Sequence, residues 1–229
     1  MPLLLRHNDS LDSHWEDCVY SEARLLAAEH KPQALAMAKM LKRLDTIQGG
    51  QRAAWRREIV AQAHVDTSDD ALDDQVDTFS RDLLYMEKGD RKSPRYKQYF
   101  KSAVSAIVRL GLESQIPVVR AMVATLAQEP EKELKAHAKA LGSILTKGDS
   151  AVTERREAAA TRAAHRAREI MSFVDDLNAS RTSIHAELAL YASKNKLPRD
   201  YADRFFRRSS KSARGVEEPG SGEPTPNPA

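Results

Sequence analysis

The chain has 229 residues, of which 41% are hydrophobic, 30% charged and 6% aromatic, and its formal net charge is +3. This length and composition suffice to bury a core without a metal, and the single cysteine, Cys18, excludes an intramolecular disulfide. No apolar run reaches the roughly 18 residues of a membrane-spanning helix, and the small net charge argues against a dedicated nucleic-acid-binding protein. We therefore expect a cytoplasmic protein without membrane contact.

Apolar residues recur at alternating spacings of four and three from residue 10 to residue 208, which predicts an all-α fold. Short connections between the predicted helices favour antiparallel neighbours, so we expect a multi-helix antiparallel bundle. This bundle should form a single domain over residues 1–208. Ser, Gly, Pro and Glu dominate residues 209–229, and this composition predicts a disordered C-terminal tail.

The first predicted helix opens with a capping-box pattern formed by Ser13 and Glu16. In such a pattern the two side chains accept hydrogen bonds from backbone N–H groups that the first turn leaves unpaired. The residues expected on the apolar side of this helix are Trp15, Val19 and Leu26.

The next predicted helix lies between a proline and a pair of glycines. We expect it to start at Pro32, because proline is favoured in a first turn, and to end at Gly49–Gly50. A weaker helix that carries Trp55 and Ile59 should then end near His64.

Two helices are predicted between residues 72 and 111. The first ends at Gly89 in the C′ position, and its apolar stripe is Leu72, Val76, Phe79, Leu83 and Met86. Ser93 and Pro94 match an N-cap followed by a first-turn proline, and Gly111 marks the expected end of that helix. Its stripe is Tyr96, Phe100, Ala103, Ile107 and Leu110.

Two more helices follow directly. The stripe of the first is Leu112, Ile116, Val119, Val123 and Leu126. The stripe of the second is Leu134, Ala138, Leu141 and Leu145, and we expect this helix to end at Gly148.

The last major helix is expected to be long, because one apolar phase continues without Gly or Pro from about Val152 to about Asn195. The stripe is Ala163, Ala167, Ile170, Val174, Leu177, Ile184, Leu188 and Tyr191. A continuous helix would measure about 65 Å at about 1.5 Å per residue, and a break near Asn178 is the alternative. After Leu197-Pro198 a short helix should carry Tyr201 and Phe205.

Arg181 occupies a position of this stripe where the phase calls for an apolar residue. One interpretation is that the side chain reaches solvent or that the helix breaks at Asn178. The other is a buried arginine that fixes the register of packing, in which case Arg181→Leu should raise stability while loosening specificity.

The sequence contains no local motif for catalysis or cofactor binding, such as a glycine-rich phosphate loop, a nucleophile elbow or a zinc-protease helix. We therefore assign no catalytic residue and no cofactor. His14, Cys18 and Glu22 share one side of a helix at four-residue spacing, but a fourth ligand is missing and core packing explains Cys18 equally well. No metal site is predicted.

An acidic run between residues 66 and 82 holds seven aspartates and one arginine. One explanation is that aspartates in the first turns of a helix interact favourably with its positive end. The functional interpretation is an acidic face that binds a partner with a basic surface. The residues assigned to that face are Asp70, Asp73, Asp74 and Asp77.

A basic turn follows at residues 88–101. The cations that could bind a polyanion are Arg91, Lys92, Arg95, Lys97 and Lys101. Tyr96 and Phe100 share the apolar stripe and should be core residues, which leaves only Tyr99 exposed for stacking on bases. A second basic concentration forms a C-terminal arm that comprises Arg199, Arg204, Arg207, Arg208, Lys211 and Arg214.

Three functional classes compete. The leading hypothesis is a non-catalytic helical scaffold or adaptor that acts through protein–protein contacts or self-association, because the sequence supplies apolar stripes and charged faces without a catalytic motif. The alternative is an accessory nucleic-acid-binding protein that uses the basic turn and the C-terminal arm. An enzyme whose site is assembled from distant residues is the third, since such a site leaves no local pattern.

Overall fold

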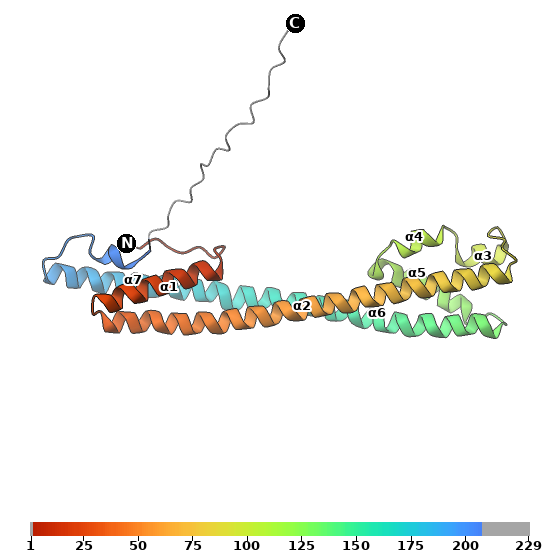
Figure 1. Ribbon diagram of the computed structural model, residues 1–229, viewed down its shortest axis with the longest axis horizontal. Helices are drawn as coiled ribbons and strands as arrows, with labels where there is room; N and C mark the ends of the chain where they lie inside the picture. The colour runs from red at the N-terminus through yellow and green to blue at the C-terminus, as the bar shows by residue number, and fades with distance from the viewer. Residues whose placement is uncertain (1, 208–229) are drawn as a thin grey trace, which may run out of the picture. The chain divides into compact units, whose positions relative to one another are not determined.

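The computed structural model describes residues 2–207, and all of its regular elements in that range are helical, which confirms the all-α class (Figure 1). In chain order they are α1 (Leu11–Ala27), α2 (Lys31–Met86), α3 (Pro94–Tyr99), α4 (Val104–Val108), α5 (Leu112–Leu126), α6 (Lys132–His165), the π-helical turn η1 (Arg166–Ile170), α7 (Met171–Lys194) and the 3-10 turn η2 (Ala202–Phe205). The tail predicted over residues 209–229 lies outside the described residues.

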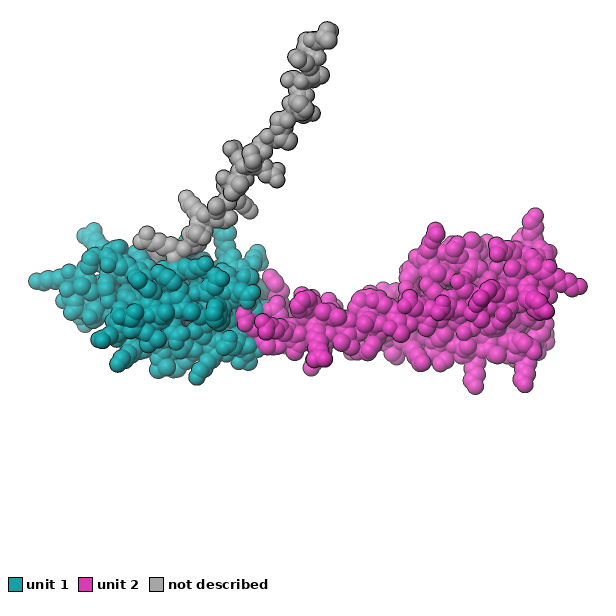
Figure 2. Space-filling model, viewed as in Figure 1, with its two compact units in different colours: residues 1–47, 170–229 teal, residues 48–169 magenta. Residues whose placement is uncertain are grey.

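The chain divides into two compact units, each with its own hydrophobic core (Figure 2). Unit 1 comprises residues 1–47 and 170–229, and unit 2 comprises residues 48–169. Because α2 passes through residue 48 without interruption, it contributes to both units. The single domain expected over residues 1–208 stays a prediction.

Helix α1 begins earlier than the capping-box pattern indicated. Ser10 is its N-cap, and the Ser10 hydroxyl accepts a hydrogen bond of 3.1 Å from the backbone N–H of Ser13. Trp15 and Leu26 are exposed, so the predicted apolar side was wrong. The buried residues of α1 are His14, Asp17, Cys18, Ser21 and Leu25. The apolar spacing did not reveal this side, because three of its residues, His14, Asp17 and Ser21, are polar and are buried only by packing against a partner segment.

Helix α2 does not end at Gly49–Gly50 or near His64, and both predictions were wrong. Gly50 allows the His165 side chain to approach α2 closely within unit 2, since a Cβ at this position would lie 2.7 Å from Cε1 of His165. A helical glycine costs about 1 kcal/mol relative to alanine, and the close approach to α6 offsets that cost.

The end of α2 is a Schellman motif whose C′ residue is Lys88, one position before the predicted Gly89. Lys88 has φ of 53° and donates its N–H to the carbonyl of Tyr85, and Gly89 has φ of 84° and donates to the carbonyl of Leu84. The glycine therefore sits at C″, where it also needs a positive φ.

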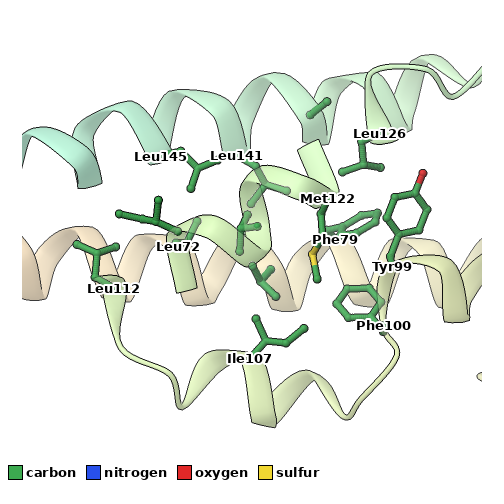
Figure 3. Packing of buried hydrophobic residues seen from close by; sticks show 14 of the residues in the cluster. Leu72, Phe79, Tyr99, Phe100, Ile107, Leu112, Met122, Leu126, Leu141 and Leu145 are labelled. Atoms are coloured by element: carbon green, nitrogen blue, oxygen red, sulfur yellow. The ribbon is translucent and has the colours of Figure 1, made fainter. Parts of the chain in front are cut away.

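The helix predicted up to Gly111 is instead split into α3 and α4. The Ser93 cap is confirmed, since its hydroxyl accepts a hydrogen bond of 3.1 Å from the N–H of Tyr96. Between the two helices the chain leaves helical geometry at Phe100, and this turn lets both Phe100 and Ile107 enter one core (Figure 3).

The core of unit 2 lies between α2, α5 and α6 and is closed by α3 and α4 (Figure 3). Phe79 is completely buried, and its ring centroid lies 5.2 Å from that of Tyr99 and 5.3 Å from that of Phe100. The predicted α5 is confirmed. Gly148 does not end α6, because it packs where a Cβ would lie 3.2 Å from Cδ1 of Leu112.

One uninterrupted helix of 63 residues comprises α6, η1 and α7, so the continuous interpretation of the C-terminal helix is confirmed. Asn178 does not break it but exchanges two hydrogen bonds with the backbone of Leu5. The π-helical turn η1 changes the helical phase, which is why Ala163 and Ala167 are exposed although they match the predicted stripe. From Ile170 onward the stripe is buried up to Leu188.

The core of unit 1 contains α1, the first part of α2, α7 and η2. The short element predicted around Tyr201 and Phe205 is confirmed as η2 with its preceding turn. The Tyr201 hydroxyl lies 2.8 Å from Nε2 of His30, and the Phe205 ring lies 5.3 Å from the His30 ring. These contacts attach the last described segment to the start of α2.

Candidate functional site

The exposed side of α2 within unit 2 carries a regular charge pattern, which we call the outer face. Its residues, all exposed, are Arg52, Arg56, Ile59, Ala63, Thr67, Asp70 and Asp74. They share one side of the helix because their spacings follow the 3.6-residue turn. The opposite side is the seam with α6, and its buried α2 residues are Ala54, Ala61, Val65 and Leu72.

Helix α6 packs antiparallel to α2 in this region and leaves the outer face uncovered. The pairing is fixed by an ion pair of 2.6 Å between Glu58 and Arg162 and by a contact of 2.9 Å between His64 and Glu154. Figure 2 shows this part of unit 2 as its thinner portion. Ile59 therefore keeps 54% of its surface exposed, although its side chain is apolar.

The structure separates the residues assigned to the acidic face. Asp70, Asp74 and Asp77 are exposed, whereas the Asp73 carboxylate is half-buried and accepts a hydrogen bond of 2.6 Å from the Gln115 amide. Burial raises the pKa of Asp73. The aspartates lie in the second half of a 56-residue helix, far from its N-terminus, so the explanation from a helix N-terminus was wrong.

The basic turn is also divided by the structure. Arg95 is half-buried and forms ion pairs with Glu129 at 2.6 Å and with Glu131. These two carboxylates raise the pKa of Arg95, which is therefore a structural link between α3 and the start of α6. Tyr99 is buried and donates a hydrogen bond of 2.5 Å to Glu129, so the prediction of an exposed Tyr99 was wrong.

Three of the four remaining cations of the turn line a concavity of about 730 Å³, which we call the basic pocket. Arg91, Lys97 and Lys101 line it, and Lys92 is exposed but is not part of the lining. The other lining residues are Tyr96, Phe100, Ser102, Ala103, Val104 and Ser105. The break between α3 and α4 creates this pocket.

Part of the C-terminal arm is occupied by ion pairs within unit 1. Arg204 contacts Asp200 at 2.9 Å, and Arg207 contacts Glu16. Arg199 is exposed, and Arg208, Lys211 and Arg214 lie outside the described residues. The described arm therefore offers fewer free cations than its sequence indicates.

Unit 1 contains a buried polar cluster between α1 and α7. Arg181 is only 3% exposed and faces the Asp17 carboxylate at 3.9 Å, with its guanidinium 5.4 Å from the Phe206 ring centroid. Neither ring nitrogen of His14 has a hydrogen-bond partner among the described residues, and burial lowers the His14 pKa. The interpretation that Arg181 reaches solvent was therefore wrong.

The potential metal ligands of α1 do not assemble a metal centre. Within residues 2–207 no group of three or more His, Cys, Asp or Glu side chains is arranged to hold a metal ion. Cys18 is buried, and burial raises the pKa of its thiol to about 12.

Within residues 2–207 no helix is long and apolar enough to cross a membrane.

Sequence reasoning missed the outer face of α2. The sequence carries a signal for this face: Arg52 and Arg56 lie as far before Ala63 as Asp74 and Asp70 lie after it. These residues share one side only if the helix is continuous, and the helix ends expected at Gly49–Gly50 and near His64 therefore hid the pattern.

Comparison of the chain with protein-family models, curated proteins and solved structures finds no match.

Proposed function

We propose that the protein is a non-catalytic, cytoplasmic helical scaffold that self-associates through the outer face of α2. The observation that supports this proposal is the self-complementary charge pattern of that face. Arg56 and Arg52 precede Ala63 by 7 and 11 residues, and Asp70 and Asp74 follow it by 7 and 11 residues. These offsets correspond to about 10 and 16 Å along the helix axis.

Two α2 helices that cross antiparallel at Ala63 bring each arginine of one copy opposite an aspartate of the other. Arg56 then faces Asp70 and Arg52 faces Asp74, and the two-fold axis repeats both pairs. One contact thus gains four ion pairs without any change in either copy. Complementary charges of this kind fix register and orientation and exclude partners with the wrong pattern.

The centre of the outer face has the shape that a helix–helix contact requires. Ala63 is small enough to let two helices approach closely, and the half-exposed Ile59 lies one turn away. Trp55 lies beside this stripe with 53% of its surface exposed, and large aromatic side chains dominate the energy of many protein interfaces. Association would remove this apolar surface from water.

A charge exchange tests the proposal. Arg56→Asp places an aspartate opposite Asp70 of the second copy twice in each dimer, so sedimentation velocity should show at least a tenfold weaker dimer. Asp70→Arg should weaken it similarly. The double variant Arg56→Asp/Asp70→Arg restores opposite charges in exchanged positions, and its dimer should return to within about threefold of the wild type.

Arg109→Asp is the matched control, because Arg109 is an exposed arginine of unit 2 outside the outer face. It changes the net charge of the chain as much as Arg56→Asp does, and it should leave the dimer unchanged. A wild-type chain that sediments as a monomer at all concentrations would refute self-association. Equal weakening by Arg56→Asp and the double variant would refute this register.

A further inference from the structure

The basic pocket concentrates positive charge that the fold does not neutralise. Among the described residues Arg91, Lys97 and Lys101 form no ion pair with a carboxylate, whereas Arg95 of the same turn is paired with glutamates. Ser102 and Ser105 also line this concavity. Three cations without a carboxylate partner and two serines thus line one space.

We propose that the basic pocket binds the phosphate groups of a small ligand that carries two linked phosphates. A single phosphate monoester carries close to two negative charges at pH 7, so two linked phosphates approach the three positive charges of the lining. Arginine contacts phosphate oxygens with two parallel hydrogen bonds, and lysine contributes a mobile point charge. The volume of about 730 Å³ lies within the range of small-molecule sites.

The arrangement favours a compact ligand over nucleic acid. A strand needs a row of free cations along its backbone, with exposed aromatic rings for its bases. Arg95 is neutralised in the middle of the turn, and Tyr99 is buried. Of the four remaining cations, Arg91, Lys97 and Lys101 line one concavity, which suits two adjacent phosphates.

Isothermal titration with inorganic pyrophosphate at about 50 mM salt tests the proposal, with inorganic phosphate and a nucleoside diphosphate as further probes. We expect the wild-type chain to bind pyrophosphate at least tenfold more tightly than phosphate. Lys97→Ser and Lys101→Ser should each weaken pyrophosphate binding about tenfold, and Arg91→Ser should weaken it at least as much.

Lys92→Ser is the control, because Lys92 is an exposed cation of the same turn outside the pocket lining. It should bind pyrophosphate as the wild type does, and circular dichroism should show that all variants are folded. Absence of pyrophosphate binding, or equal weakening by Lys92→Ser, would overturn the proposal. It would also be overturned if single-stranded DNA bound and pyrophosphate did not displace it. Sedimentation of these variants is expected to match the wild type, which separates this test from that of the outer face.

Discussion

Phe79→Ala should lower the free energy of unfolding by about 3 to 5 kcal/mol in urea denaturation followed by circular dichroism. Phe79 is completely buried, and the rings of Tyr99, Phe100 and His137 contact it. The variant loses the transfer free energy of the ring and leaves a cavity between α2 and α3. Because the neighbouring rings are held by other contacts, they cannot fill that space.

Tyr85→Ala is the matched control for this substitution. Tyr85 lies on the same helix, six residues further along, but 87% of its surface is exposed. Truncation of an exposed aromatic residue should change the free energy of unfolding by less than about 0.5 kcal/mol. Equal losses in the two variants would show that the α2 stripe is not the core of unit 2.

Arg181→Leu should lower the free energy of unfolding by about 3 kcal/mol at pH 7, which reverses the gain expected from the sequence. The reason is Asp17, whose side chain is 11% exposed and which faces Arg181 in unit 1. Removing the arginine alone leaves a buried carboxylate without a cation. Burial already raises the pKa of Asp17 from its ordinary value of 3.8, and loss of Arg181 raises it further.

The pH dependence of this variant gives the second half of the test. An acid whose pKa is higher in the folded state is neutral at low pH, and it costs stability as the pH rises through its unfolded value and above. The deficit of Arg181→Leu relative to wild type should therefore be smaller near pH 4 than at pH 7. Arg181→Leu/Asp17→Ala removes both charges and should recover most of the loss at both pH values. A deficit that is independent of pH and persists in the double variant would contradict this account.

Local apolar spacing predicted the helical class well, because the 3.6-residue period is a property of each helix by itself. Helix ends were harder to predict, because a glycine that ends or begins a helix looks the same in sequence as a glycine that permits close packing inside one. Gly111 has φ of 70° and precedes α5, where it is the N-cap. Gly50 and Gly148 lie inside helices, where they allow close approach to His165 and Leu112. Only the partner segment distinguishes the two roles.

The candidate sites could be predicted only in part for the same reason: the sequence does not show which distant segments pack against them. The cations of the basic turn were identified from sequence, but their division into Arg95 and the pocket residues depends on Glu129 and Glu131, which lie more than 30 residues away. The place of Arg181 in the stripe allowed burial as one of two interpretations, but it did not decide between burial and exposure to solvent. The partner of Arg181, Asp17, could not be identified, because it lies on a helix far away in sequence.

Disulfide trapping at the centre of the outer face is the most direct measurement of the proposed self-association. In the proposed dimer Ala63 lies on the two-fold axis, so Ala63→Cys places two thiols opposite each other. A disulfide needs the two Cα atoms to lie about 4.4 to 6.8 Å apart, which only residues at the axis satisfy. Cys18 can be kept, since it is 1% exposed and burial raises its thiol pKa to about 12.

Under mild oxidation, Ala63→Cys should form a covalent dimer on a non-reducing gel and revert to monomer on reduction. Ala71→Cys is the control, because Ala71 is also exposed on α2 but lies eight residues from the axis. We predict a covalent dimer for Ala63→Cys and none for Ala71→Cys or the wild type. Failure of Ala63→Cys to cross-link, or equal cross-linking of both variants, would contradict the antiparallel pairing of α2.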